Sequence, residues 1–173
     1  MSVHYGPRVL TENVTYILTD STLTASYNGD VVNIFKTSGS NGWDKQAYSL
    51  VPFTAPCTIE FNKLAGTTDN GVSYAMIGWN SDPTTDASYA SIDWAAYPYR
   101  MDNYSVYNNG SQVVFGGVWD SLKKFYIVYD TDGYIRHYNG STLLASFNKG
   151  TGQTVYVDSS FYSPNSTYGG FSN

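Results

Sequence analysis

Carboxylates are the side chains that hydrolytic chemistry would need first, and this chain has only two glutamates, Glu12 and Glu60, far apart in unrelated contexts. A β-sandwich glycosidase uses two carboxylates about 5 to 10 Å apart. In lectin-like hydrolases both usually come from one strand, and the sequence contains no such pair. Glu60 alternates with Ile59 and Phe61, so we interpret it as a solvent-facing residue of a strand. These observations predict a protein that is not an enzyme.

The other residues of nucleophilic or metal chemistry are equally isolated. His4 and His137 have no acidic or cysteine partner at a recognisable spacing, and no Gly-x-Ser-x-Gly elbow occurs. His137 lies in a strand-like pattern and is interpreted as a packed or hydrogen-bonded residue. Cys57, the only cysteine, shares a strand face with Ile59 and Phe61 and is expected to be buried. We therefore predict no cofactor and no metal site.

Aspartates form two clusters that could bind calcium. The run Asp130-Thr-Asp-Gly133 resembles the start of an EF-hand loop but lacks its later oxygen ligands, so we interpret it as a hairpin turn. The second cluster offers four oxygen-bearing side chains: Asn80, Asp82, Asp86 and Asp93. Asx turns and caps explain these residues better than a Ca²⁺ site does.

An aromatic run at residues 94–107 provides the best candidates for binding. Flat rings beside Asp and Asn side chains suit stacking on sugar faces, with hydrogen bonds to the hydroxyls, and Tyr is equally common in protein interfaces. Packing of the same rings in the core is the alternative, and it is favoured for the run as a whole. The candidate binding residues are Trp79, Asp82, Asp86, Trp94, Tyr97, Tyr99, Tyr104 and Tyr107.

The amino-acid composition and charge indicate which classes of binding partner to expect. Aromatic residues make up 17% of the chain, with 17 Tyr, 8 Phe and 4 Trp, whereas charged residues make up only 13%. Tyr suits half-buried sheet faces and wet contact surfaces alike. The formal net charge is -5 and the basic residues are scattered. Binding to nucleic acid or to an anionic membrane would need a basic stripe, so we expect neither partner.

The candidate residues must be positioned by short strand-like segments, in which apolar and polar residues alternate and which turns separate. Apolar and aromatic segments flank Thr131-Asp-Gly133, and another follows Asn139-Gly140, which together predict a three-strand meander. A further hairpin is predicted around Asn28-Gly29, an inner strand over 72–79 and a strand over 154–157. A short helical turn is expected around 119–124, and irregular loops over 80–89 and 159–173. The spacing between turns indicates an all-β antiparallel β-sandwich.

One domain of this kind is expected over residues 13–173. Residues 1–12 have no hairpin partner, and Gly6-Pro7 disfavours a continuous strand or helix, so they are predicted to form an extended arm. Tyr5, Val9 and Leu10 would anchor this arm on a neighbouring subunit or coat protein. The first residues lack a secretion-signal pattern and no stretch approaches a membrane span, so we expect synthesis in a cytoplasm.

Several segments together resemble the concanavalin A-like lectin/glucanase superfamily, which includes laminin-G-like domains. The likeness is to its non-catalytic members in tailed-phage virion proteins, and the opening segment 5–13 resembles the entry segment of phage structural proteins with laminin-G-like domains. The segments that carry the likeness are Gly42–Tyr48, Met76–Pro83, Ser88–Trp94, Val106–Ser111 and Tyr126–Gly140.

The resemblance implies a jelly-roll sandwich used in virions for receptor contact or for decorating a capsid or tail. The leading hypothesis is a non-enzymatic phage virion protein, either a capsid-decoration (cement) protein or a small tail-associated component. It would contact viral coat or tail proteins through Tyr-rich surfaces and form a homotrimer by analogy with other virion modules. The alternative is a carbohydrate-binding module or lectin that recognises a host-surface glycan. The acidic pair of the hydrolases and the paired metal loop of legume lectins are both missing.

Overall fold

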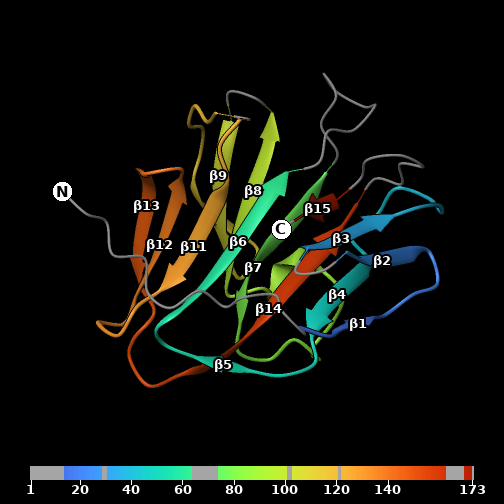
Figure 1. Cartoon of the computed structure of the whole chain (residues 1–173), viewed down its shortest axis with the longest axis horizontal. Coiled ribbons are helices and arrows are strands. Elements are labelled where there is room, and N and C mark those ends of the chain that lie inside the picture. The colour runs from blue at the N-terminus through green and yellow to red at the C-terminus, as the bar shows by residue number, and fades with distance from the viewer. Residues whose placement is uncertain are drawn as a thin grey trace.

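The computed structural model describes residues 14–28, 31–63, 74–100, 103–120, 122–162 and 170–172. These residues form two β-sheets packed face to face, which confirms the predicted β-sandwich (Figure 1). All pairings between the named strands of these segments are antiparallel. Within the same segments, no helix is long and apolar enough to cross a membrane.

The first sheet, called sheet I, has the order β1-β4-β14-β7-β8-β9-β10, and β5 pairs with β14 beside this path. Its central strand β7 is buried at every position, as the apolar pattern on both of its faces predicted. The strands of sheet I are β1 (Tyr16–Leu18), β4 (Lys45–Ser49), β5 (Phe53–Thr54), β7 (Ala75–Asn80), β8 (Trp94–Arg100), β9 (Asn103–Asn108), β10 (Ser111–Val114) and β14 (Thr154–Phe161).

The second sheet, called sheet II, has the order β13-β12-β11-β6-β15-β3-β2. The predicted meander is its β11-β12-β13 part, and the predicted hairpin around Asn28 joins β2 to β3. The strands of sheet II are β2 (Leu23–Asn28), β3 (Val31–Lys36), β6 (Cys57–Lys63), β11 (Phe125–Tyr129), β12 (Tyr134–Asn139), β13 (Thr142–Asn148) and β15 (Gly170–Ser172).

Glycines close the two turns of the meander. Gly133 and Gly140 have φ values of 84° and 60°, which lie in the left-handed region that side chains with a Cβ rarely adopt. A Cβ on Gly133 would also crowd the backbone of Gly150. The Asp130–Gly133 segment is therefore a turn, as predicted, and Gly133 N donates to Asp130 O at 3.0 Å.

The core lies between the sheets and follows the alternation of each strand. Cys57, Ile59 and Phe61 of β6 all point inward, as expected from their spacing, and burial raises the pKa of the Cys57 thiol to about 12. Phe61 stacks on Phe125 of β11 with ring centroids 5.1 Å apart. Burial of such apolar side chains is the main force that holds the two sheets together.

One expectation about a loop was wrong in part. Residues 159–161 belong to β14, where Ser159, Ser160 and Phe161 are buried between β4 and β7. Small polar residues suggested a loop, but Ser159 Oγ donates to Ala47 O at 2.7 Å, so hydroxyls are satisfied inside the sheet. At the helical turn expected around 119–124, Lys123 N donates to Asp120 O at 3.1 Å, so a single hydrogen-bonded turn is present, and residue 121 lies outside the described residues. The only helix assigned among the described residues is the 3₁₀ helix η1 (Tyr89–Ser91).

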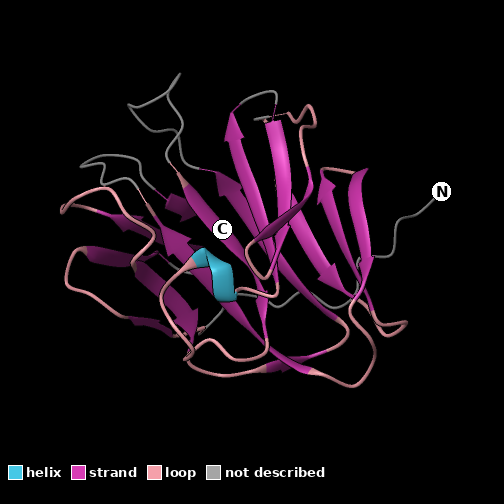
Figure 2. Ribbon diagram, turned by 180° about the vertical axis from the view of Figure 1, so that it is seen from behind, coloured by secondary structure: helices cyan, strands magenta, loops and turns pink. Residues whose placement is uncertain are grey.

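The segment 81–93, which connects β7 to β8 and contains η1, lies against the outer face of sheet I (Figure 2). Ile92 of this segment is buried with Met76 and Ala95, whose side chains point away from the main core. Sheet I therefore has packed side chains on both faces. Two hollows, described below, lie on this outer face.

Candidate functional site

Strand alternation separates the predicted binding residues into two groups. Trp79 and Trp94 are cross-strand partners on β7 and β8, and both side chains point inward. Tyr104 of β9 points inward as well, whereas Tyr97 and Tyr107 contact the cluster on the outer face. Because successive side chains of a strand alternate between faces, one aromatic run supplies both the core and the surface.

The inward group, which was predicted to bind a ligand, packs between the two sheets. Trp79 is fully buried, and its indole Nε1 donates to Ile127 O of sheet II at 3.1 Å. Trp94 stacks on Phe147 of sheet II with centroids 4.3 Å apart. Tyr104 is also buried and its hydroxyl lies 2.7 Å from His137 Nδ1. These three rings join the two sheets.

His137 has the structural role expected of it. Complete burial lowers the pKa of its imidazole to about 3, so the ring is neutral at physiological pH. Burial also disfavours the charged form of Tyr104, so the pKa of its phenol is raised. No partner is present for His137 Nε2 among the described residues.

The outward group forms an aromatic cluster beside η1. Tyr97 and Tyr107 pack against Trp43 and Tyr89 on Met76, Ile92 and Ala95. Ring centroids are 5.7 Å apart for Trp43 and Tyr97, and 5.5 Å apart for Tyr89 and Tyr107. Tyr99 lies in β8, but its side chain falls outside the described residues.

A buried carboxylate anchors the segment 81–93 to sheet I. Asp158 of β14 accepts hydrogen bonds from Gln46 Nε2 at 2.9 Å, Asn80 Nδ2 at 2.8 Å and its neighbour Ser159 N at 2.8 Å. Gln46 Nε2 also donates to Pro83 O at 2.6 Å, which ties the segment to β4. Burial raises the pKa of Asp158 to about 7, although the three donors act in the opposite direction.

Asp86 and Asp93 of this segment each bind their own partners and do not form a shared site. Asp86 Oδ1 accepts from Ser88 N at 2.8 Å and Ser91 Oγ at 2.9 Å, as expected for an Asx turn. Asp93 forms an ion pair with Lys149 at 2.6 Å. Burial opposes its ionisation, but the hydrogen bonds from Lys149 and Ser81 prevail and lower the pKa of Asp93. Within the described segments, no group of three or more His, Cys, Asp or Glu residues could hold a metal ion.

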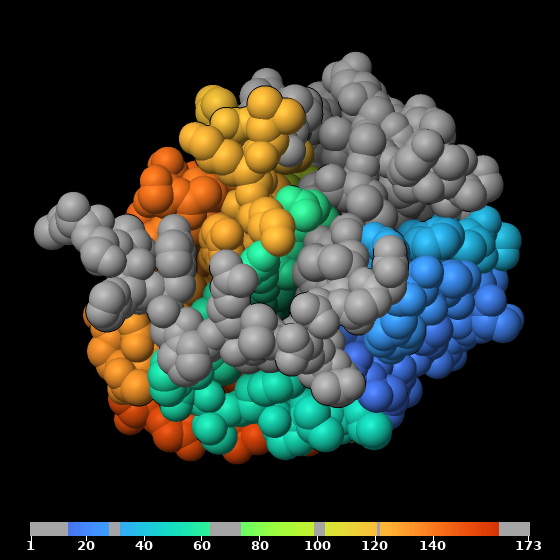
Figure 3. All heavy atoms as spheres, viewed as in Figure 1, coloured from blue at the N-terminus to red at the C-terminus, as the bar shows by residue number. Residues whose placement is uncertain are grey.

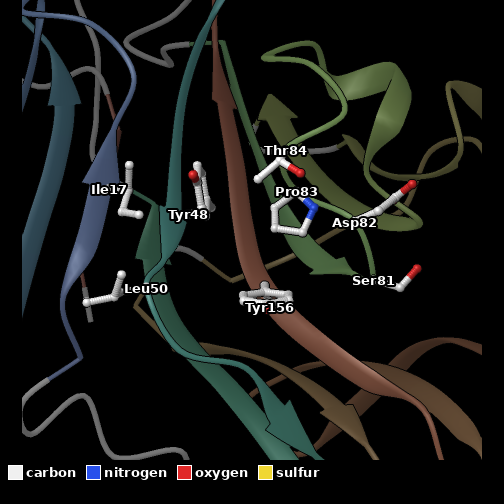
Figure 4. Close-up of a pocket in the computed structure, with 8 residues that line it drawn as sticks. All are labelled: Ile17, Tyr48, Leu50, Ser81, Asp82, Pro83, Thr84 and Tyr156. Carbon is white, nitrogen blue, oxygen red and sulfur yellow. The ribbon is translucent and has the colours of Figure 1, made fainter.

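The larger hollow, called the Tyr48–Tyr156 hollow, has a volume of about 410 Å³. Tyr48 of β4 and Tyr156 of β14 lie between an apolar wall and the start of the segment 81–93 (Figure 4). Asp82 is the one predicted binding residue that lines it. The complete lining is Ile17, Tyr48, Leu50, Ser81, Asp82, Pro83, Thr84 and Tyr156.

Sequence reasoning missed Tyr48 and Tyr156 even though both lie in alternating segments. Tyr156 is an outward residue of the predicted strand 154–157, and Tyr48 follows the buried Ala47. Alternation could have shown that both face away from the core. Their proximity depends on the pairing of β14 with β4, two strands more than a hundred residues apart in sequence. The predicted arm residues Tyr5, Val9 and Leu10 lie outside the described residues, and so the arm stays a prediction.

Three solved structures with similar folds are informative. The TRIM65 PSpry domain has a TM-score of 0.59 at 14% identity, covering 92% of this chain and 88% of that domain. Carbohydrate-binding module CBM66 from Bacillus subtilis has a TM-score of 0.51 at 12% identity, covering 96% and 93%. A legume lectin-like domain from Entamoeba histolytica has a TM-score of 0.51 at 10% identity, covering 91% and 84%.

These similarities concern the fold, since every identity is far below that of close relatives. No protein-family model and no curated protein matches the sequence. The three structures have a β-sandwich fold like that of this chain, which agrees with the predicted jelly-roll sandwich. The narrower resemblance to phage virion proteins has no counterpart among them.

Proposed function

We propose that this protein is a carbohydrate-binding module that receives its sugar in the Tyr48–Tyr156 hollow. The observation that carries the proposal is the pairing of two tyrosine rings with an opposed polar wall in one hollow of about 410 Å³. This volume lies within the range of about 300 to 1,000 Å³ usual for small-molecule sites. CBM66 and the lectin-like domain add support at the level of fold alone.

The two walls match the two kinds of surface that a sugar presents. Tyr48 and Tyr156 can pack against C–H faces, and Ile17 and Leu50 extend that apolar surface. Leu50 is 55% exposed, so part of this apolar surface is accessible to a ligand. Stacking at this wall would supply much of the affinity.

The opposite wall supplies hydrogen bonds. Ser81, Asp82 and Thr84 carry hydroxyl and carboxylate oxygens, and a carboxylate accepts strongly from sugar hydroxyls. Asp82 Oδ2 already accepts from Thr85 Oγ1 at 3.0 Å, which orients the carboxylate before a ligand arrives. Such preorganisation reduces the entropic cost of binding.

The position of this wall depends on buried contacts beneath it. Gln46 Nε2 holds the Pro83 carbonyl at 2.6 Å, and Asp158 holds Gln46 in turn. Asn80 Oδ1 accepts from Asp82 N at 3.1 Å, which fixes the start of the same segment. These contacts would keep the polar wall at a constant distance from the two tyrosines.

The proposal is tested with a glycan array followed by calorimetry on each glycan that binds. We expect Tyr48→Ala, Tyr156→Ala and Asp82→Asn each to weaken binding roughly tenfold or more, which corresponds to about 1.4 kcal/mol. Tyr138→Ala, which changes a half-buried tyrosine of β12 in sheet II, is the matched control and should bind as the wild type does. Circular dichroism verifies that each variant is folded. Absence of any glycan ligand, or full binding by Tyr48→Ala and Tyr156→Ala, would refute the proposal.

A structural role in a phage virion is a second candidate, and one observation favours it. Three apolar side chains near the end of β10 are largely exposed: Phe115 at 76%, Val118 at 80% and Leu122 at 94%. The segment around them, gold in Figure 3, projects from one end of the molecule. The contact surface would thus consist of Phe, Val and Leu, not of the tyrosines proposed from composition.

In this role the protein would be made in the host cytoplasm and would bind coat or tail proteins, or sister subunits of a homotrimer. Native mass spectrometry and binding to purified phage particles test it. We expect Phe115→Ser with Val118→Ser to abolish assembly, while Leu143→Ser, at an exposed residue of β13, leaves it unchanged. A monomer with no affinity for particles would exclude this candidate and leave glycan binding open.

A further inference from the structure

A second hollow lies on the outer face of sheet I, and the described residues that line it are all aromatic. Its volume is about 240 Å³, and it is lined by Trp43, Tyr74, Tyr97 and Tyr162. The four residues come from four separate parts of the chain: the loop before β4, the position before β7, β8, and the position after β14. Only the folded chain brings the four rings together.

The four rings follow one another in a closed circuit. Ring centroids are 5.7 Å apart from Trp43 to Tyr97, 6.5 Å from Tyr97 to Tyr74, 5.9 Å from Tyr74 to Tyr162, and 5.4 Å from Tyr162 back to Trp43. Neighbouring ring planes are inclined by 45° to 82°. The rings therefore form the walls of a box. The middle of a square circuit of this size lies roughly 4 Å from each centroid, within the range of about 6 Å for cation–π contacts.

We propose that this box binds a quaternary ammonium group. Each aromatic face carries partial negative charge, so four rings around one point favour a cation without a hydrogen-bond donor of its own. A sugar is a poorer match, because none of the four described lining residues offers a carboxylate or amide to its hydroxyls. The net charge of -5 also favours approach of a small cation.

Lys36, which donates to the backbone of Tyr162, and Lys45, two residues after Trp43, both pair with carboxylates. Lys36 Nζ lies 3.6 Å from Asp44, and Lys45 Nζ lies 2.9 Å from Asp20. Lys36 is fully buried and donates to Tyr162 O at 3.0 Å, so it joins one wall of the box to β3. Lys36 thus positions the box and adds little net repulsion to a bound cation.

Other side chains brace the remaining walls. Tyr89 lies 5.1 Å from Trp43, and Tyr107 lies 6.0 Å from Tyr97, measured between ring centroids. Beneath these rings Met76 is buried in the small cluster of the outer face. This side of the aromatic cluster is therefore packed by the protein's own residues, while the four-ring box is hollow. A preformed box loses little entropy when it binds a ligand.

The test compares choline with 3,3-dimethylbutan-1-ol, which has the same shape but no charge. Calorimetry and tryptophan fluorescence measure binding to the intact protein, with Trp43→Phe identifying the ring that reports. We expect choline to bind and the neutral alcohol to bind at least tenfold more weakly. Equal binding of the two would show that the hollow is merely apolar, and no binding of choline would also overturn the proposal.

Three further variants keep the result independent of folding and of glycan binding. Tyr97→Phe keeps the ring and should retain choline binding, whereas Tyr97→Leu removes one wall and should weaken it roughly tenfold. Tyr156→Ala, in the other hollow, should not change choline affinity. Loss of choline binding in Tyr156→Ala, with retention in Tyr97→Leu, would assign the cation to the other hollow and refute the box.

Discussion

The hydroxyl of Tyr104 in sheet I lies 2.7 Å from Nδ1 of His137 in sheet II, and both side chains are buried. This hydrogen bond crosses the core and joins β9 to β12. Phe125 stacks on Tyr104 with centroids 5.4 Å apart, so the polar pair is enclosed by an aromatic ring. A buried polar pair of this kind is costly to break from one side alone.

We predict that Tyr104→Phe lowers the free energy of unfolding by about 1 to 3 kcal/mol, because His137 Nδ1 then lacks its partner. Replacing both partners by apolar side chains, Tyr104→Phe with His137→Leu, should cost less than the two single changes added together. Urea unfolding of the four proteins forms a double-mutant cycle. Strict additivity would contradict the coupling.

Asp158 gives the stability a pH dependence of known sign. The pKa of this carboxyl is about 7 in the folded protein against an ordinary value of 3.8, so between about pH 4 and 7 the folded state binds more protons than the unfolded state. The free energy of unfolding therefore falls as the pH rises through this range. Asp158→Asn removes this contribution, so the variant should gain stability relative to the wild type as the pH increases.

Comparing the wild type with Asp158→Asn also removes the contribution of His137, which changes stability with pH in the opposite direction. That ring has a pKa of about 3 against an ordinary 6.5, so the unfolded state binds more protons below about pH 6.5 and acid destabilises the fold. His137 is present in both proteins, and its effect cancels in their difference. A difference in urea midpoint that stays constant from pH 4 to 7.5 would show that Asp158 is ionised throughout.

Gln46 is predicted to hold the polar wall of the Tyr48–Tyr156 hollow. Gln46→Leu removes the donor to Pro83 O and one donor to Asp158, which should cost about 2 kcal/mol and increase amide exchange in the segment 81–93. Hydrogen exchange with mass spectrometry measures the change. Gln112→Leu, at an exposed glutamine of β10, is the matched control. Equal exchange in the two variants would remove Gln46 from this role.

Gly78 is predicted to admit no side chain. A Cβ at this position would overlap the backbone carbonyl oxygen of Trp94 on the adjacent β8, and a backbone atom cannot move aside cheaply. Gly78→Ala should therefore lower the thermal midpoint strongly or prevent folding. Gly42→Ala, whose Cβ would meet only ordinary contacts of 3.5 Å or more at Asp44, should change it little. A stable Gly78→Ala variant would mean that β7 and β8 can separate.

Much of the fold follows from the sequence alone. The period-two alternation at Cys57–Phe61 and the turns at Gly133 and Gly140 are local properties of the chain, and the structure has the strands and turns that they predict. The burial of Cys57 and the structural role of His137 follow from the same alternation. These features are predictable because backbone geometry and residue spacing determine them within a few positions.

Only the tertiary structure decided which aromatic residues lie in the core and which lie on the outer face of sheet I. Alternation shows that Trp94 and Tyr97 lie on opposite faces, but not which face another sheet covers. It also cannot show that Tyr48 lies beside Tyr156, since β4 meets β14 only through long-range pairing. The hollows on sheet I arise from contacts between segments far apart in the chain, and such contacts depend on the packing of the whole sandwich, not on local preference.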